Sequence, residues 1–147
     1  MRLHASCVAL DGAGLLLLGP AGAGKSSLAL RLMERGWMLV ADDQVLLQAA
    51  PALLAAAPAE LAGMIELRGL GLYAGLPHGP APVALAARLL PLSAMPRLPA
   101  PARFEALGQS VPEIPLSAED PAAPEKAAWA MATLAGRRRQ VAGALAP

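Results

Sequence analysis

The sequence predicts an α/β fold, in which a mixed sheet begins with a hairpin near the N-terminus and carries flanking helices. Three observations predict it. Residues 3–10 and 13–18 are apolar runs of strand length, and the second ends in consecutive leucines, as in a strand buried on both faces. Asp11-Gly12 between them is the dipeptide favoured by a two-residue hairpin turn, because both central residues need positive φ. Residues 27–35 then show the apolar spacing of an amphipathic helix.

The composition indicates one globular domain. The chain has 147 residues, of which 56% are hydrophobic and 16% charged, and this argues against a disordered chain. A net charge of +1 provides no basic field for nucleic acid. The single cysteine, Cys7, cannot form an internal disulfide, and no apolar run reaches the roughly 18 residues of a membrane span. We therefore expect a cytoplasmic protein that binds neither nucleic acid nor a membrane.

The later elements have weaker patterns. We expect strands at 37–40, 45–47 and 64–68, a strand or a helix at 83–90, and a loop at 49–62 with or without a helical turn. Many prolines between 91 and 115 predict a surface excursion, and Pro124 is well placed for the first turn of a helix ending at Leu134. The predicted single domain, 1–147, has a core at 3–90, an irregular proline-rich segment at 91–123 and a C-terminal helix at 124–135.

A phosphate-binding loop joins the leucine strand to the first helix. The segment Gly19-Pro-Ala-Gly-Ala-Gly-Lys-Ser26 fits the Walker A pattern G-x-x-x-x-G-K-[ST]. Glycines let backbone N–H groups approach phosphate oxygens, and the helix that follows presents its positive end. Lys25 can reach the β- and γ-phosphates, and the Ser26 hydroxyl can coordinate Mg²⁺. The alternative is a glycine-rich turn with a chance lysine. The residues expected to contact ATP are Gly19, Pro20, Ala21, Gly22, Ala23, Gly24, Lys25, Ser26 and Ser27.

An acidic pair, Asp42-Asp43, follows the next strand. The helix of about 11 residues and the returning strand of about 5 both span roughly 16 Å, so the carboxylates return to the level of the loop. Adjacent residues of a strand point to opposite faces, which predicts different roles. One carboxylate would hold Mg²⁺ through water, and the other would act as a general base toward a hydroxyl. A solvated turn or a helix cap is the alternative.

Two further residues are candidates for the same site. The Asp11-Gly12 turn pairs Leu10 with Ala13, and counting back along both strands places His4 opposite Gly19. An exposed histidine at a hairpin end is the alternative. Glu66 lies in an alternating strand, where it forms a surface pair with Arg68 or, beside Mg·ATP, becomes a metal ligand.

Four segments in this order resemble the HPr kinase/phosphorylase family, and specifically its short alphaproteobacterial form with the catalytic domain only. They are His4-Ala5, the loop at 19–26, Arg35-Gly-Trp-Met-Leu-Val-Ala-Asp-Asp43 and Ile65-Glu-Leu-Arg-Gly-Leu-Gly71. The resemblance covers residues 3–75. It implies a P-loop fold related to phosphoenolpyruvate carboxykinase, and transfer of phosphate from ATP or pyrophosphate to a serine of HPr, a phosphotransferase-system carrier. It also implies reversal by phosphorolysis and assembly into hexamers.

The resemblance also assigns roles. His4 matches the family's active-site histidine, and Lys25 matches its catalytic lysine. Asp43 matches the residue that takes the proton from the acceptor serine, while Ser26 and Glu66 match magnesium ligands. With Asp42, these complete the expected site.

Some residues depart from the family pattern. Ser27 stands where an acidic residue is usual, and no counterpart of the family's arginine loop is evident, with Arg97 and Arg103 as candidates. The family's N-terminal regulatory domain has no counterpart in the sequence. These departures motivate the alternative function, a non-catalytic nucleotide-sensing module that acts by binding a partner. Outside the site, we expect Cys7 to be buried and Trp129 to fill the core.

Overall fold

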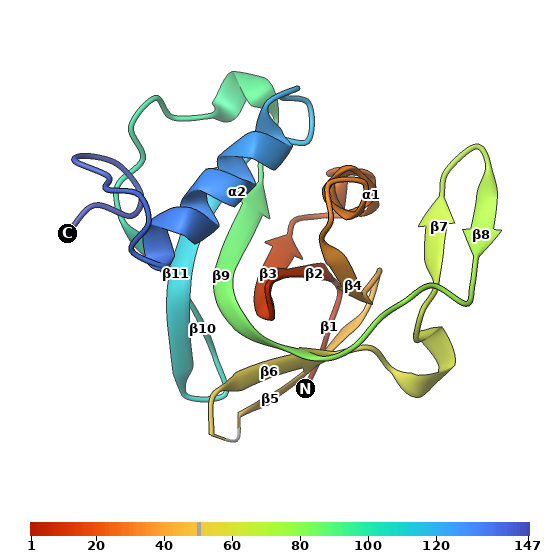
Figure 1. Cartoon of the computed structure of the whole chain (residues 1–147). Coiled ribbons are helices and arrows are strands. Elements are labelled where there is room, and N and C mark those ends of the chain that lie inside the picture. Colours follow the sequence, from red (N-terminus) through yellow and green to blue (C-terminus); the bar gives the residue numbers. More distant parts are fainter. Residues whose placement is uncertain (50) are drawn as a thin grey trace.

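A computed structural model describes residues 1–49 and 51–147, and it shows a strongly curled mixed sheet with two helices against one side (Figure 1). The helices are α1 (Lys25–Met33) and α2 (Ala123–Leu134), and there are two short 3₁₀ helices, η1 (Ala59–Leu61) and η2 (Leu92–Ala94). The strands are β1 (Arg2–Leu3), β2 (Ser6–Leu10), β3 (Ala13–Leu18), β4 (Met38–Ala41), β5 (Val45–Ala49), β6 (Leu53–Ala56), β7 (Ile65–Leu67), β8 (Gly71–Tyr73), β9 (Ala81–Leu89), β10 (Ala102–Ala106) and β11 (Gln109–Leu116).

The long strand β9 joins the two halves of the chain. It pairs in parallel with β3 and with β11, and antiparallel with β6. The order along the large sheet is β1-β5-β6-β9-β3-β2-β4, with β11 also on β9 and β10 on β11. Parallel and antiparallel pairs coexist, so the prediction of an α/β fold with a mixed sheet and an N-terminal hairpin is confirmed.

The N-terminal hairpin has the predicted turn and register. Leu10 pairs with Ala13 and Ser6 with Leu17, and both Asp11 (φ 51°) and Gly12 (φ 81°) have positive φ. The ladder ends at Ser6, however, so the expected pairing of His4 with Gly19 does not form. The predicted strand over 3–10 is interrupted at His4 and Ala5, because β1 pairs with β5 instead of continuing the hairpin.

Strand β3 is buried on both faces, as predicted. Leu15 and Leu17 pack in the cluster that contains Leu28 of α1 and Ala127 of α2, whereas Leu16 packs in a second cluster inside the curl of the sheet. Burial of each leucine contributes about 1.5–3 kcal/mol. The phosphate-binding loop therefore begins at the end of the best-buried part of the sheet.

Two predictions of irregular structure are wrong. The expected loop over 49–62 contains β6, which pairs with β5. The 3₁₀ helix η1 is a helical turn of the kind that the expectation allowed. Ala50, which also falls in this expected loop, lies outside the described residues. Leu53 and Ala55 are buried while Leu54 and Ala56 are half-buried, so the strand alternation exists, but alanine hides it in the sequence. The expected irregular segment over 91–123 contains the β10–β11 hairpin, whose turn residues Leu107 and Gly108 have φ of 52° and 74°. The prolines of this hairpin lie within β11 or directly before β10.

The C-terminal helix is confirmed, with Pro124 in its first turn, and residues 83–90 form most of strand β9. The expectation that Trp129 fills the core is wrong. Alanines and Met131 form the buried face of α2, and Trp129 is 57% exposed with the Arg138 guanidinium 3.4 Å from its ring centroid. Cys7 is fully buried, as expected, and burial raises the pKa of its thiol to about 12.

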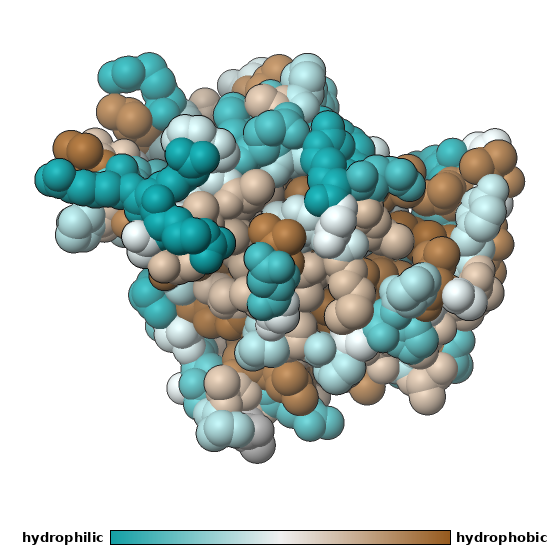
Figure 2. Space-filling model, in the orientation of Figure 1, coloured by the Kyte–Doolittle hydropathy of each residue, from teal (hydrophilic) through white to brown (hydrophobic). Residues whose placement is uncertain are grey.

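The β7–β8 hairpin stands away from the body of the molecule (Figure 1). Leu70 and Leu72 on it are 71% and 63% exposed, and this end of the molecule is coloured as apolar in Figure 2. None of the helices in the described residues is long and apolar enough to cross a membrane.

Candidate active site

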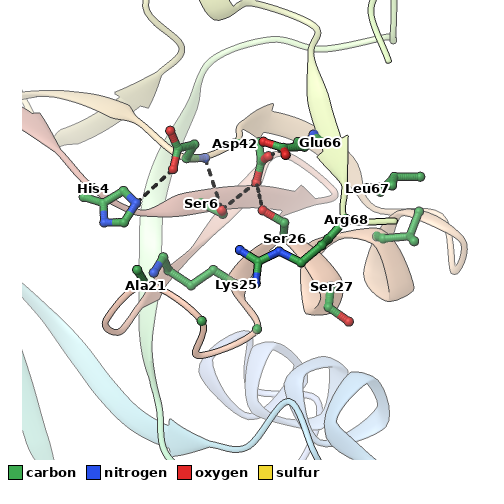
Figure 3. A pocket seen from close by; sticks show the side chains of 14 residues that line it. His4, Ser6, Ala21, Lys25, Ser26, Ser27, Asp42, Glu66, Leu67 and Arg68 are labelled. Carbon is green, nitrogen blue, oxygen red and sulfur yellow. Dashed lines mark hydrogen bonds and ion pairs between the residues drawn. The ribbon is translucent and has the colours of Figure 1, made fainter. Parts of the chain in front are cut away.

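A pocket of about 450 Å³ opens beside the phosphate-binding loop. Four segments line it: the turn before β2, the loop and first turn of α1, the residues after β4, and β7 with the residue after it (Figure 3). Its predicted site residues are His4, Ala21, Gly22, Gly24, Lys25, Ser26, Ser27, Asp42, Asp43 and Glu66. Gly19, Pro20 and Ala23 belong to the same loop and do not line the pocket.

The loop has little room for side chains. Gly24 has φ of 97°, and a Cβ atom placed on it would lie 2.5 Å from the Cβ atom of Ala118. Gly22 has φ of 83°, and a Cβ atom there would meet nothing within 4 Å. Glycine at 24 is therefore required both by backbone conformation and by space, and glycine at 22 by conformation alone.

Lys25 lies over the loop that precedes it. Its Nζ donates to the carbonyl oxygens of Gly19 at 2.6 Å and Pro20 at 3.0 Å, and the residue is 7% exposed. Burial lowers the pKa of this ammonium group, while Asp43 and Asp42 act in the opposite direction. A cation held by weak neutral acceptors is well suited to move onto phosphate oxygens.

The two carboxylates of the acidic pair differ in exposure, with Asp42 buried and Asp43 exposed. Both residues follow the end of β4, so this separation does not come from the strand alternation that the sequence predicted. Asp42 is 6% exposed, and its Oδ1 accepts hydrogen bonds from the hydroxyls of Ser26 at 2.6 Å and Ser6 at 2.8 Å. The backbone N–H of Glu66 donates weakly to its Oδ2 at 3.4 Å. Figure 3 shows both hydroxyls directed at this one carboxylate.

Asp43 and His4 face the pocket together. The Nε2 atom of His4 lies 2.8 Å from Asp43 Oδ1, and the two side chains are 52% and 63% exposed. The structure thus brings His4 to the acidic pair, although not through the pairing with Gly19 that the hairpin predicted. An exposed carboxylate beside an imidazole is an arrangement that can accept a proton.

The oxygen atoms at this site suit a hard cation. Ser26, Asp42 and Glu66 offer a hydroxyl and two carboxylates in one pocket, and Mg²⁺ prefers oxygen ligands. Within residues 1–49 and 51–147, no group of three or more His, Cys, Asp or Glu side chains is arranged to hold a metal ion alone. The donor set fits Mg²⁺ only together with phosphate oxygens and water, which is how Mg²⁺ is usually held.

Comparison with known sequences and structures identifies the family. The family described as HPr Serine kinase C-terminal domain matches residues 1–74, which is half of the chain. The chain belongs to this family. The chain is similar to the HPr kinase/phosphorylase of Clostridium tetani, with 44% identity over 72 residues that make up 48% of this chain and 24% of that protein. The match to the HPr kinase/phosphorylase of Levilactobacillus brevis has 42% identity over 72 residues, 48% of this chain and 23% of that protein.

The structural similarity extends further along the chain than the sequence match does. The Hpr(Ser) kinase/phosphatase from Coxiella burnetii superimposes with a TM-score of 0.74 and 30% identity, over 92% of this chain and 88% of that chain. The chain spans about a quarter of the length of the curated relatives it matches. The matched half contains the loop, the acidic pair and Glu66, and the second half contributes the rest of the sheet.

Two features of the site and its surroundings were not predicted from the sequence. The first is Ser6, which donates a hydrogen bond to Asp42. In the sequence it stands out only as a hydroxyl at the start of an otherwise apolar strand. The pairing of Cys7 with Ala41 places this strand beside the acidic pair. Arg31 donates to the carbonyl oxygens of Ala118, Asp120 and Pro121 and so ties α1 to the segment before α2. No sequence pattern identifies such a contact between distant segments. Neither candidate arginine is among the residues lining the pocket, and Arg103 donates instead to Ser110.

Proposed function

We propose that this chain is the catalytic core of an ATP-dependent protein-serine kinase whose acceptor is HPr or a related phosphocarrier of the phosphotransferase system. One observation carries the proposal: the exposed Asp43 carboxylate and the phosphate-binding loop line the same pocket. The names of the relatives and the sequence match across this pocket support the choice of acceptor. The opening admits an acceptor side chain, because Asp43 and His4 are both more than half exposed.

Each residue of the site has a separate role in the proposed reaction. Backbone N–H groups of the loop and Lys25 hold the ATP phosphates and stabilise charge on the transferred group. Asp43 accepts the proton of the acceptor serine as its oxygen bonds to the γ-phosphorus, and the bond from that phosphorus to the ADP oxygen breaks. His4 orients the Asp43 carboxylate through the 2.8 Å contact. Ser26, Glu66 and, through water, Asp42 would hold Mg²⁺, which supplies charge neutralisation at the phosphates when bound.

The same site accounts for the reverse reaction. Inorganic phosphate would occupy the position of the β-phosphate and attack the phosphorus of phosphoserine. Pyrophosphate would form as the bond from that phosphorus to the serine oxygen breaks. Asp43 would then return its proton to the serine oxygen. We propose this phosphorolysis as a second activity of the site, with the phosphate-binding loop holding the attacking phosphate.

The experiment is a phosphotransfer assay with purified HPr, followed by mass spectrometry. Wild-type protein with Mg·ATP is expected to add one phosphoryl group to a serine. Asp43→Asn keeps the shape of the side chain and loses the base, so it is expected to bind ATP normally and to lose about 10²–10⁴-fold in rate. Asp11→Asn is the matched control, because Asp11 is also exposed with positive φ but lies in the hairpin turn.

Two results would contradict the proposal. Undiminished transfer by Asp43→Asn would remove the role of Asp43. Binding of ATP by the wild-type protein without labelling of any phosphocarrier would favour a nucleotide-sensing module instead.

The same proposal implies a cellular compartment and an assembly state for the protein. We place the reaction in the cytoplasm, where ATP and phosphocarriers meet and where a buried free thiol such as Cys7 stays reduced. We also propose a homo-oligomer, with the hexamer implied by the family resemblance as the expected mass in native mass spectrometry.

A further inference from the structure

One hydroxyl contacts both members of the acidic pair. Ser6 is the first residue of β2 and is fully buried. Its Oγ donates to Asp42 Oδ1 at 2.8 Å and accepts from the backbone N–H of Asp43 at 3.4 Å. Figure 3 shows Ser6 between the loop and the acidic pair, as one of the residues that line the pocket. A buried hydroxyl with both bonds directed at the site is the observation from which the inference starts.

Asp42 depends on this hydroxyl for its orientation. Its carboxylate is nearly buried, and a buried carboxylate is stable only when its oxygens accept hydrogen bonds. Both strong donors, Ser6 and Ser26, point at Oδ1, whereas Oδ2 has only the 3.4 Å contact from Glu66. Ser26 is also a proposed metal ligand. Of the two strong donors to Asp42, Ser6 is therefore the one without a proposed role as a metal ligand.

Asp43 depends on the same strand for its backbone conformation. Its φ is 68°, and Gln44 N–H donates to Asp42 O at 2.8 Å across it, which makes a tight three-residue turn. Such turns are strained and persist only where neighbouring groups hold them. Ala5 N–H donates to Asp43 O at 3.2 Å, and Ser6 accepts from Asp43 N–H. Ala5, which directly precedes β2, and Ser6, its first residue, thus hold the carbonyl oxygen and the N–H group of Asp43.

We propose that Ser6 is a positioning residue, which fixes the Asp42 carboxylate against Ser26 and holds Asp43 in the turn that directs its carboxylate to the pocket. The inference rests on the proposed kinase function. It assigns Ser6 no contact with substrate, because the side chain is fully buried. Its removal is expected to slow phosphoryl transfer and to weaken metal-assisted nucleotide binding while leaving acceptor binding unchanged.

The test compares Ser6→Ala and Ser6→Cys with a control. Cys has nearly the same shape as Ser but only a weak S–H donor, so it separates hydrogen bonding from packing. Both variants are expected to lose about 10–100-fold in kcat with KM for HPr unchanged, because outer groups that orient metal ligands have effects of this size. Cys7→Ala is the control, because Cys7 is the next residue of β2, is equally buried and touches neither aspartate. It is expected to retain kcat.

Nucleotide titrations with and without Mg²⁺ give a readout that needs no acceptor. In Ser6→Ala and Ser6→Cys, the affinity gained on adding Mg²⁺ is expected to fall about 10-fold relative to Cys7→Ala, while affinity in a chelator stays unchanged. The inference would be overturned if Cys7→Ala and Ser6→Cys lost phosphoryl transfer and melting temperature to the same extent. That result would mean that Ser6 has a purely structural role. Wild-type kcat and wild-type Mg²⁺ dependence in Ser6→Cys would also overturn it.

The crystal structure of Ser6→Cys separates this inference from the kinase proposal. If wild-type protein labels no phosphocarrier, the proposed function fails. The positioning role is still tested, because the crystal structure of Ser6→Cys shows whether Asp42 has moved away from Ser26 and whether Asp43 has lost its positive φ. Movement of either aspartate supports the role of Ser6. Unchanged positions of both in the crystal overturn it.

Discussion

At the scale of single residues, the proposed base occupies a strained backbone conformation. Asp43 is one of three non-glycine residues with positive φ among the described residues, and it is the only one of these that lines the pocket. Positive φ costs an L-residue about 1–2 kcal/mol, less for aspartate than for bulkier residues. The strain directs one carboxylate of the pair outward while the other stays buried.

Replacing Asp43 by Gly or by Ala isolates this strain. Both variants lose the carboxylate, but only Gly adopts positive φ without a steric penalty. We expect Asp43→Gly to be about 1 kcal/mol more stable than Asp43→Ala in urea unfolding, with both inactive in phosphoryl transfer. Equal free energies of unfolding for the two variants would show that the backbone is relaxed at this position.

Sequence predicted these residue roles unevenly. The Walker A spacing identified Lys25 and Ser26, and counting element lengths brought Asp42 and Asp43 level with the loop. His4 reaches the pocket, although the sequence predicted a different route. The predicted pairing with Gly19 does not form, because the hairpin ladder ends at Ser6. Ser6 itself was not found, because a single hydroxyl in an apolar strand has no motif.

At the scale of elements, the second half of the chain supports the phosphate-binding loop. The segment just before α2 contacts the loop at Gly24, and Arg31 of α1 donates to three carbonyl oxygens of the same segment. The loop is therefore clamped between its own helix and a turn about 90 residues away in sequence.

A double-mutant cycle tests the contact between Gly24 and Ala118. Gly24→Ala places a methyl group 2.5 Å from the Ala118 Cβ at φ of 97°, so we expect nucleotide affinity to fall at least about 10-fold and stability to fall by about 1–3 kcal/mol. Ala118→Gly should recover the steric part of that loss in the double variant. Gly22→Ala, which has space but positive φ, provides the comparison for strain alone.

Additive effects of the two substitutions would contradict a direct contact between Gly24 and Ala118. If the losses from Gly24→Ala and Ala118→Gly simply sum in both affinity and stability, the two residues do not press on one another.

The strands that sequence missed have faint or interrupted patterns. In β6 two leucines are followed by two alanines, so the period of two that marks a strand is faint. In the β10–β11 hairpin, two prolines lie within β11, and such prolines led to the prediction of irregular structure. Trp129 was wrongly placed in the core for a related reason. Alanine fills the buried face of α2, leaving the one large aromatic side chain outside.

At the scale of the whole molecule, one large sheet takes strands from both halves of the chain, although only the first half carries the family's sequence pattern. The family matches residues 1–74, yet β3, which leads into the loop, is flanked by β9 from beyond that region. Leu85 and Ala87 of β9 pack in the same cluster as Leu15 and Leu17. Pairing between such distant strands is set by packing and topology, which local periodicity does not specify.

A fragment containing residues 1–80 is therefore expected not to fold. It retains every predicted site residue but loses β9, β11 and α2, so one edge and one face of β3 become exposed. Circular dichroism should show no cooperative unfolding transition, and titration should show no nucleotide binding. A fragment that unfolds cooperatively and binds ATP would contradict the view that the second half supports the site.

The most direct measurement of the central claim is a crystal structure with Mg²⁺ and a non-hydrolysable ATP analogue. The account predicts phosphates along residues 19–26, with Lys25 Nζ moved from the carbonyl oxygens of Gly19 and Pro20 onto phosphate oxygens. It also predicts that the Asp43 carboxylate faces the γ-phosphorus across a gap that one hydroxyl fills. Phosphates bound elsewhere, or an Asp43 side chain turned away from the γ-phosphate, would contradict it.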